Sequence, residues 1–179
     1  VEDDAFYTAD GAKLRVGRPV DVTGGGIAAG DGYDLPRRGA AADGERRTER
    51  EAKIPDIRND ENLAVAQVHA FFIRLHNKVV DDQMAKGVPS AMLFESARAL
   101  VTRHYQWMLH HDYLMRVADP GVVHDVFSNG RRIFEVNSPT KFGTMPVEFS
   151  GAAFRLGHSM IRNRYEWNRF FHSGADALD

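Results

Sequence analysis

The sequence predicts a mainly α-helical fold that follows a long, glycine-rich, irregular N-terminal segment. After residue 58, apolar residues recur in alternating steps of four and three, the spacing that places side chains on one face of a helix. Residues 1–57 hold nine of the sixteen glycines, which favours turns and loops. The chain has 179 residues, of which 43% are hydrophobic, enough for one globular domain with a buried core.

Residues 1–57 are predicted to form a loop-rich segment that covers the core. Glycine clusters such as Thr23-Gly-Gly-Gly26 interrupt regular structure, and Lys13–Val16 has the pattern of a short strand. A loop this long is unusual in a compact domain unless it is functional or lies over a core built by other residues. We therefore expect the helical core within residues 58–179.

The first helix is predicted from Asn59 or Asp60, either of which can cap it, to Ala85, before Gly87 and Pro89. The residues of its predicted apolar stripe are Glu61, Val65, Val68, Phe72, Leu75 and Val79.

A second helix is predicted over residues 90–117 and a short one near 122–128, followed by a loop with a short strand at 132–136. The second helix repeats the same spacing in Leu93, Ala97, Leu100, His104, Trp107, His111 and Leu114.

The last helix is predicted over residues 145–161, and its stripe places His158 on the core side. An imidazole there needs a partner for each ring nitrogen, or a metal for one of them. Arg155, three residues earlier, needs an anion if it is buried. Heme meets both needs, because iron takes an imidazole and a propionate takes an arginine. The alternative is a hydrogen-bonded core histidine beside an arginine whose charge reaches solvent.

The run Asp56–Asn62 opens the first helix and carries Arg58 and Glu61, three residues apart. Both are expected on the side of the apolar stripe, with the Glu61 carboxylate partly buried. A fixed guanidinium at Arg58 would stabilise the negative charge that develops on the departing oxygen when the O–O bond of a peroxide breaks. The alternative is an ion pair between Arg58 and an acid at the helix start.

Composition excludes several classes of protein. The net charge of −2 argues against a nucleic-acid binder or a protein of anionic membranes. The apolar runs are too short to span a bilayer, and the absence of cysteine excludes disulfides and thiolate metal sites within this chain. We expect a fragment of a longer polypeptide. The oligomeric state stays open, as does the compartment, where a secreted or extracellular location is favoured over a cytoplasmic one.

Three ordered motifs over about residues 54–165 resemble the animal-type heme peroxidase (peroxidase–cyclooxygenase) superfamily, in the manner of a bacterial-like member. The first is the run Ile57-Arg-Asn-Asp-Glu-Asn-Leu63 followed by His69-Ala-Phe-Phe-Ile-Arg-Leu-His-Asn77. The second is Ala97-Arg98, then Tyr105-Gln-Trp107 and Asp112-Tyr-Leu114. The third is Ala152-Ala-Phe-Arg-Leu-Gly-His-Ser159. Each motif alone is weak, whereas three in order are specific.

The resemblance implies a role for each of four residues within the helical heme peroxidase core. His158 would be the proximal ligand of the iron of heme b, and Arg58 the distal-side catalytic arginine. Glu61 stands where many members form an ester with a heme methyl group, so the resemblance allows a covalent link there. Arg155 would pair with a heme propionate. Residues 58–179 would then be the central part of a heme peroxidase domain, incomplete at both ends.

The implied activity is reduction of hydrogen peroxide coupled to oxidation of a small organic donor or a halide. Two alternatives remain: a fatty-acid dioxygenase of the same superfamily, and a non-catalytic helical module. Arg155 favours the peroxidase, because the oxygenase branch places a radical-forming tyrosine three residues before the proximal histidine. The isolated fragment is expected to be inactive.

Three departures from the family pattern accompany this resemblance. Asn62 stands where some mammalian members have a methionine bonded to heme, so that link is not expected. The distal histidine and a calcium-binding loop are expected upstream, through residues outside this chain. The asparagine that orients the proximal histidine is expected beyond Asp179.

Other histidines are interpreted as structural. His69 and His76 are expected to be fold residues, because a metal site would need a third ligand. His110 and His111 precede Asp112, but adjacent residues point to different faces of a helix, so a metal site is not predicted there. Trp107, Tyr105 and Tyr113 are expected to pack in the core.

Overall fold

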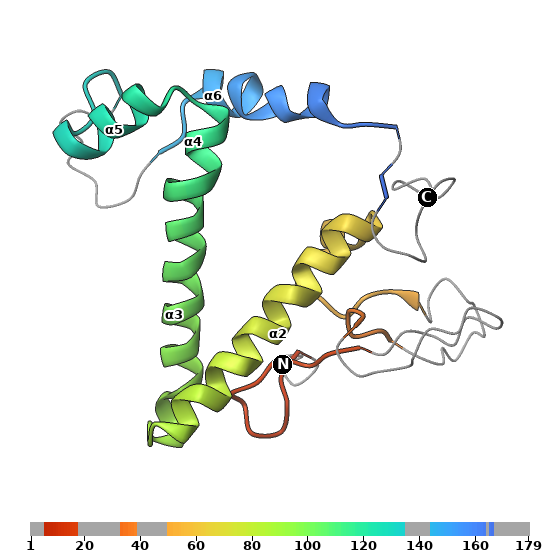
Figure 1. The fold of residues 1–179 in the computed structure, drawn as a ribbon. Coiled ribbons are helices and arrows are strands. Elements are labelled where there is room, and N and C mark those ends of the chain that lie inside the picture. The colour runs from red at the N-terminus through yellow and green to blue at the C-terminus, as the bar shows by residue number, and fades with distance from the viewer. Residues whose placement is uncertain (1–5, 18–32, 39–49, 135–143, 164, 167–179) are drawn as a thin grey trace. The chain divides into compact units, whose positions relative to one another are not determined.

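The computed structural model describes residues 6–17, 33–38, 50–134, 144–163 and 165–166. Most of these residues are helical (Figure 1), and β structure among them is limited to three isolated antiparallel bridges. The mainly α-helical class is therefore confirmed. The helical elements are η2 (Ile57–Asp60), α2 (Leu63–Ala85), η3 (Ser90–Met92), α3 (Leu93–Met108), the π-helix η4 (Leu109–Tyr113), α4 (Leu114–Val117), α5 (Pro120–Asn129), α6 (Val147–Gly151) and η5 (Ala153–Met160).

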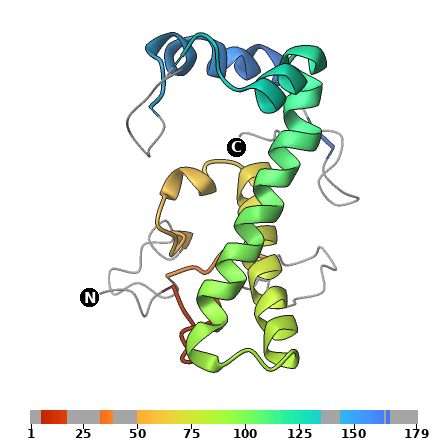
Figure 2. The same cartoon turned by 90° about the vertical axis from the view of Figure 1, so that its left-hand side faces the viewer.

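The chain divides into two compact units, which we describe separately. Unit 1 comprises Val1–Thr102 with Asn163–Asp179, and unit 2 comprises Arg103–Arg162. Within unit 1, the red and orange N-terminal segments lie beside α2 in both views (Figures 1 and 2).

Helix α2 begins three or four residues later than predicted, because Asn62 caps it. Asn62 is extended (φ −149°, ψ 158°), and its side-chain oxygen accepts a hydrogen bond from the Val65 N–H at 3.0 Å. Residues 57–60 form a separate 3₁₀ turn that Asp56 caps through the Arg58 N–H. The helical spacing therefore does not run through Glu61, which was wrongly placed on the stripe of the long helix.

The buried face of α2 lies about one residue further along the sequence than predicted. Val65 and Val68 are exposed, whereas small residues pack inward against the N-terminal segment. Alanines let the helix backbone approach that segment closely, so the larger valines are left outside. The first core cluster contains Leu35, Ala52, Ile54, Ala66, Ala70 and Ile73.

A second cluster joins the end of α2 to the start of α3 and to the N-terminal segment. It contains Ala12, Val80, Leu93 and Ala97. Next to it, the buried His76 has its Nε2 atom 2.9 Å from the Ala12 carbonyl oxygen. The amide of Asn77 makes two hydrogen bonds with the backbone of Leu14, each 2.8 Å long. Residues 12–14 are thus held to α2 by polar as well as apolar contacts.

The predicted helix over residues 90–117 is confirmed, with an irregularity that the periodicity did not show. It consists of η3, α3, η4 and α4 in unbroken succession. The π-turn at Leu109–Tyr113 adds a residue to one turn and shifts the stripe. Trp107 is 60% exposed, and Tyr105 and Tyr113 are about half exposed, so their predicted core positions are wrong.

The short helix α5 matches its prediction closely. Asp119 caps it by accepting from the N–H groups of Gly121 and Val122, and Pro120 occupies the first turn. Gly130 ends it with φ of +83°, a conformation that side-chain-bearing residues rarely adopt. Residues 132–134 form bends, and the remainder of the predicted strand at 132–136 lies outside the described residues.

The predicted last helix over residues 145–161 is broken. Helix α6 ends at Gly151, because Ala152 leaves the helical region with φ −130° and ψ −69°. The chain then continues as the 3₁₀ helix η5 from Ala153 to Met160. Three residues per turn replace 3.6 there, so the stripe predicted from Val147 to Ile161 does not form.

Candidate functional site

His158 lies in η5 and its ring orientation is set by the backbone of the same turn. The Nδ1 atom is 3.0 Å from the carbonyl oxygen of Arg155. A carbonyl oxygen only accepts hydrogen bonds, so Nδ1 carries the proton and the lone pair of the neutral ring is on Nε2. This tautomer is the one in which Nε2 can bind a metal.

Arg155 lies one 3₁₀ turn before His158, so the two side chains leave the same face of η5. Its Nε atom donates to the Ser150 carbonyl oxygen at 3.2 Å. This bond fixes the guanidinium near the junction of α6 and η5. Arg155 thereby places a positive charge on the side of the turn that carries His158.

His158 and Arg155 are exposed in the structure, which corrects the expectation that they face the core. Within the described part of unit 2, no apolar layer covers η5, and Phe154, Leu156 and Met160 are each about two-thirds exposed. An imidazole with a free Nε2 lone pair, a cation and uncovered apolar side chains are the groups that a flat, anionic, iron-bearing ring requires. These residues fit heme.

Arg58 is held by Asp56 rather than by Glu61. Its Nε and Nη2 atoms donate to the two carboxylate oxygens of Asp56 at 2.9 and 2.6 Å. This pairing lowers the pKa of Asp56 to about 2, because the Arg58 side chain and backbone N–H both bond to the charged carboxylate. It also raises the pKa of Arg58, which therefore stays positively charged.

The side chains of Arg58 and Glu61 are exposed, so the expectation that Glu61 is partly buried is wrong. Arg58 is 78% exposed although it is paired. Both leave the short turn before α2, which the extended Asn62 separates from the apolar face of the helix. The structure places these two residues together in unit 1 and places Arg155 with His158 in unit 2.

Sequence reasoning missed a partly buried charge cluster next to this turn. Arg37 donates from Nε and Nη2 to Asp34 at 3.0 and 2.7 Å, and from Nη1 to Asp60 and to the Arg50 carbonyl oxygen. The side chains of Arg37, Asp34 and Asp60 are only about one-fifth exposed. The spacing of Asp34 and Arg37 was the available signal, but the contact with Asp60 joins residues far apart in sequence.

Three other histidines differ in their surroundings. His111 stacks on Trp107 at 4.6 Å and His110 on Phe127 at 3.7 Å between ring centroids. His69 has a buried Nδ1 atom with no partner among the described residues, and burial lowers its pKa. In the described ranges, no three His, Cys, Asp or Glu side chains are grouped so as to hold a metal ion.

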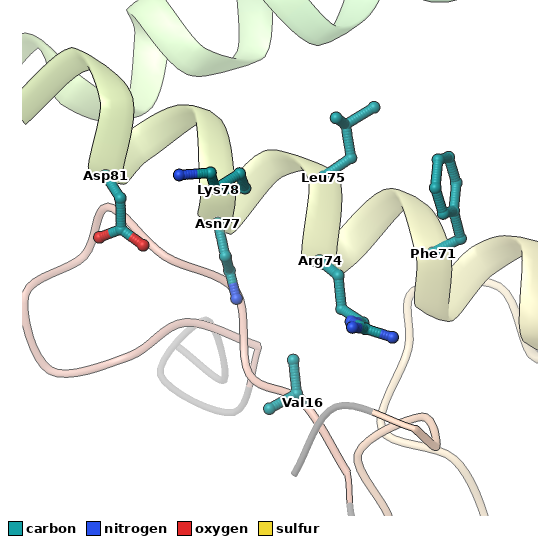
Figure 3. Close-up of a pocket in the computed structure, with 7 residues that line it drawn as sticks. All are labelled: Val16, Phe71, Arg74, Leu75, Asn77, Lys78 and Asp81. Atoms are coloured by element: carbon teal, nitrogen blue, oxygen red, sulfur yellow. The ribbon is translucent and has the colours of Figure 1, made fainter. Parts of the chain in front are cut away.

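An open groove of about 670 Å³ lies along α2, and none of the four predicted site residues lines it (Figure 3). Its polar side chains already have internal partners. Asn77 binds Leu14, the Asp81 carboxylate is 2.6 Å from Lys13 Nζ, and Arg74 lies over the Tyr33 ring. We interpret the groove as a seam where the N-terminal segment meets α2. It is lined by Val16, Phe71, Arg74, Leu75, Asn77, Lys78 and Asp81.

A model of the animal haem peroxidase family matches residues 9–176, which is nearly the whole chain. The chain belongs to this family. The match includes Arg58, Glu61, Arg155 and His158, and extends into the N-terminal segment beyond the three motifs. Membership of the animal haem peroxidases implies binding of heme. No solved structure matches the chain.

Individual relatives among the animal haem peroxidases are distant. Thyroid peroxidase of Mus musculus is 31% identical over 142 residues, which are 75% of this chain and 15% of that protein. A peroxidase-like protein of Margaritifera margaritifera is 28% identical over 114 residues, 62% of this chain and 14% of that protein. Peroxidase mlt-7 of Caenorhabditis elegans is 27% identical over 113 residues, which are 62% of this chain and 15% of that protein. The chain thus spans about one seventh of these relatives' length.

Among the described helices, none is long and apolar enough to cross a membrane.

Proposed function

We propose that the protein containing this chain is a heme peroxidase that reduces hydrogen peroxide and oxidises a small organic donor or a halide. The observation that carries the proposal is the hydrogen bond from His158 Nδ1 to the Arg155 carbonyl oxygen. It leaves the Nε2 lone pair for iron, in a chain of the animal haem peroxidase family. His158 is then the proximal ligand.

Heme b, when bound, supplies an iron that coordinates peroxide and exchanges electrons with it. The chain's own contribution on the proximal side is to hold the His158 ring by the bond to Arg155. The Arg155 guanidinium, held by Ser150, supplies the positive charge that a propionate requires. Glu61 is proposed as a point of covalent attachment, because its exposed carboxylate is free of the Asp56–Arg58 pair.

Arg58 is proposed to assist cleavage of the O–O bond. Heterolysis gathers negative charge on the departing oxygen, and a guanidinium already fixed in place stabilises that charge without reorganising. The carboxylate of Asp56 fixes Arg58 through two of its nitrogens. The raised pKa of Arg58 keeps it charged, so it acts by charge and hydrogen bonding and not by giving up its proton.

The net reaction balances without a further reagent. Hydrogen peroxide takes two electrons from the donor and two protons from solvent, the O–O bond breaks, and two molecules of water form. Either two organic molecules lose one electron each, or one halide ion loses two electrons and combines with one of the water molecules, releasing a proton, to give the hypohalous acid. A distal base and a calcium site, supplied by residues outside this chain, remain part of the proposal, as does an extracellular location.

The test compares Arg58→Ala with Arg116→Ala in the full-length protein. Arg116 is a matched control, because it is 76% exposed and bound to Asp112 at 2.6 Å, much as Arg58 is bound to Asp56. At equal heme content, Arg58→Ala should slow the peroxide-dependent change in the Soret band by about 100-fold or more, and Arg116→Ala should not. Equal rates in both variants would remove Arg58 from the mechanism.

A product assay tests the reaction class. We expect peroxide with a phenolic donor to give oxidised donor, and oxygen with a fatty acid to give no hydroperoxide. Hydroperoxide formation would assign the protein to the oxygenase branch, and a full-length protein without a Soret band after expression with heme would be a non-catalytic member.

A further inference from the structure

The cluster formed by Arg37, Asp34 and Asp60 is joined to the turn that carries Arg58. Four hydrogen bonds leave the Arg37 guanidinium: two to Asp34, one to Asp60 and one to the Arg50 carbonyl oxygen. Asp60 is the last residue of η2, two residues after Arg58 and next to Glu61. The contact at Asp60 therefore holds the end of the turn from which Arg58 projects.

The base of this cluster is anchored to the core. Leu35 is fully buried against α2, and Arg37 pairs with Ala52 across an antiparallel bridge. On either side, Arg38 N–H bonds to the Glu51 carbonyl oxygen and Lys53 N–H bonds to that of Pro36. Arg37 thus reaches η2 from a backbone that is itself fixed on both sides.

Arg37 also separates two carboxylates that compete for one arginine. Arg58 already reaches a carboxylate two residues away, at Asp56, and Asp60 lies two residues away on the other side. Asp60 is bound to Arg37 instead, and that pair is more buried than the Arg58 pair. Charge-assisted bonds that are shielded from solvent are the stronger ones, so Asp60 stays with Arg37.

We propose that Arg37 is a positioning residue for the peroxidase reaction: it holds the η2 turn against the core and keeps the Asp60 carboxylate away from Arg58. This inference rests on the proposed function of Arg58. Arg37 itself is not proposed to contact peroxide or heme. Its effect on the reaction passes entirely through the position and the pairing of Arg58.

The experiment uses the full-length protein and has two readouts. The first is the rate of the peroxide-dependent Soret change at equal heme content. The second is amide hydrogen exchange of the peptide that spans residues 57–61, which needs no turnover. The variants are Arg37→Gln, the double variant Arg37→Gln/Asp60→Asn, and Arg38→Gln. Arg38 is the matched control, because it is adjacent and binds Glu51 in an exposed pair at 3.0 Å.

Arg37→Gln should slow the Soret change by roughly tenfold to a hundredfold, because a small displacement of a catalytic group has effects of that size. Exchange in residues 57–61 should become faster. Arg38→Gln should change neither. The double variant should recover a several-fold part of the rate, because the neutral amide that replaces the Asp60 carboxylate no longer competes for Arg58. That recovery distinguishes positioning from a loss of packing alone.

If Arg37→Gln fails to fold, Arg37→Lys serves instead: a lysine keeps the charge but cannot make the forked bonds, so it should show the same slowing to a smaller degree. A rate and an exchange pattern equal to those of Arg38→Gln would overturn the inference. A double variant as slow as the single one would also overturn it.

Arg58→Ala measured in parallel separates the two proposals. An unchanged rate in Arg58→Ala overturns the proposed function of Arg58, while faster exchange in Arg37→Gln would still support the anchoring role of Arg37.

Discussion

The Nδ1 atom of His158 donates to the carbonyl oxygen of Arg155, three residues earlier, across 3.0 Å. Because donor and acceptor belong to one 3₁₀ turn, the tautomer of the ring is fixed by local backbone geometry. A metal site on Nε2 therefore needs no other side chain of this chain to select the protonation state.

His158→Ala should abolish normal heme ligation in the full-length protein, because it removes the Nε2 lone pair that is proposed to bind the iron. The Soret maximum and heme content of the purified protein would show the loss. Free imidazole should restore part of the ligation by entering the vacated space. His124→Ala, an exposed histidine of α5, should leave the spectrum unchanged, and a normal spectrum in His158→Ala would show that another residue binds the iron.

The Asp56–Arg58 pair should survive to low pH. The pKa of Asp56 is about 2 in the folded chain against an ordinary value of 3.8. The contribution of the Asp56–Arg58 pair to folding stability is therefore present above pH 3.8 and is lost as the pH falls through about 2. An NMR titration of the Asp56 carboxyl carbon measures this pKa directly. Arg58→Ala should return the pKa toward its ordinary value, while Arg116→Ala should leave it low. A low pKa that persists in Arg58→Ala would assign the effect to another group.

His69 should make folding stability depend on pH in the mildly acidic range. Burial lowers its pKa in the folded state, so the unfolded chain takes up the proton more readily below pH 6.5, and stability falls as the pH falls through that region. His69→Phe should remove part of this loss, measured as the difference in urea midpoint between pH 7.5 and 5.5. His124→Phe should keep the wild-type difference in urea midpoint. Equal differences in the wild type and both variants would exclude His69 as the cause.

Asn77 should contribute more to stability than its neighbour Lys78. Asn77→Ala breaks both bonds to Leu14 and leaves a part-buried backbone N–H and C=O unpaired, which costs about 1–3 kcal/mol. Lys78→Ala removes an exposed pair with Asp82, and such pairs contribute little. Urea unfolding measures this difference, and Asn77→Ala should have the lower midpoint. Equal midpoints in the two variants would show that the N-terminal segment is held without Asn77.

The helices could be predicted because their signals are local. The caps and glycine stops around α5, and the long apolar repeats of α2 and α3, lie within the elements that they specify. The orientation of α2 could not be predicted in the same way. Its inward face was chosen by Ala66 and Ala70 packing against Leu35, and that contact joins residues more than thirty positions apart.

The candidate site shows the same division. Residue type and the resemblance identified the four candidate site residues, Arg58, Glu61, Arg155 and His158. Neither predicted that these residues would lie in short turns. Ala152 breaks the predicted helix. Gly151 directly before it was the available stop signal, but it was taken as part of the stripe. Arg37 was missed because its importance comes from Asp60, a partner that only the folded backbone brings near.

The bonds between Asn77 and Leu14 and the pairing of Arg37 with Asp60 fasten the N-terminal segment at two points, one on α2 and one on the turn before it. The two ties hold different parts of that segment, Leu14 in one case and Arg37 in the other. Breaking one tie leaves the other in place, so a single substitution at either point should release only one part of the segment.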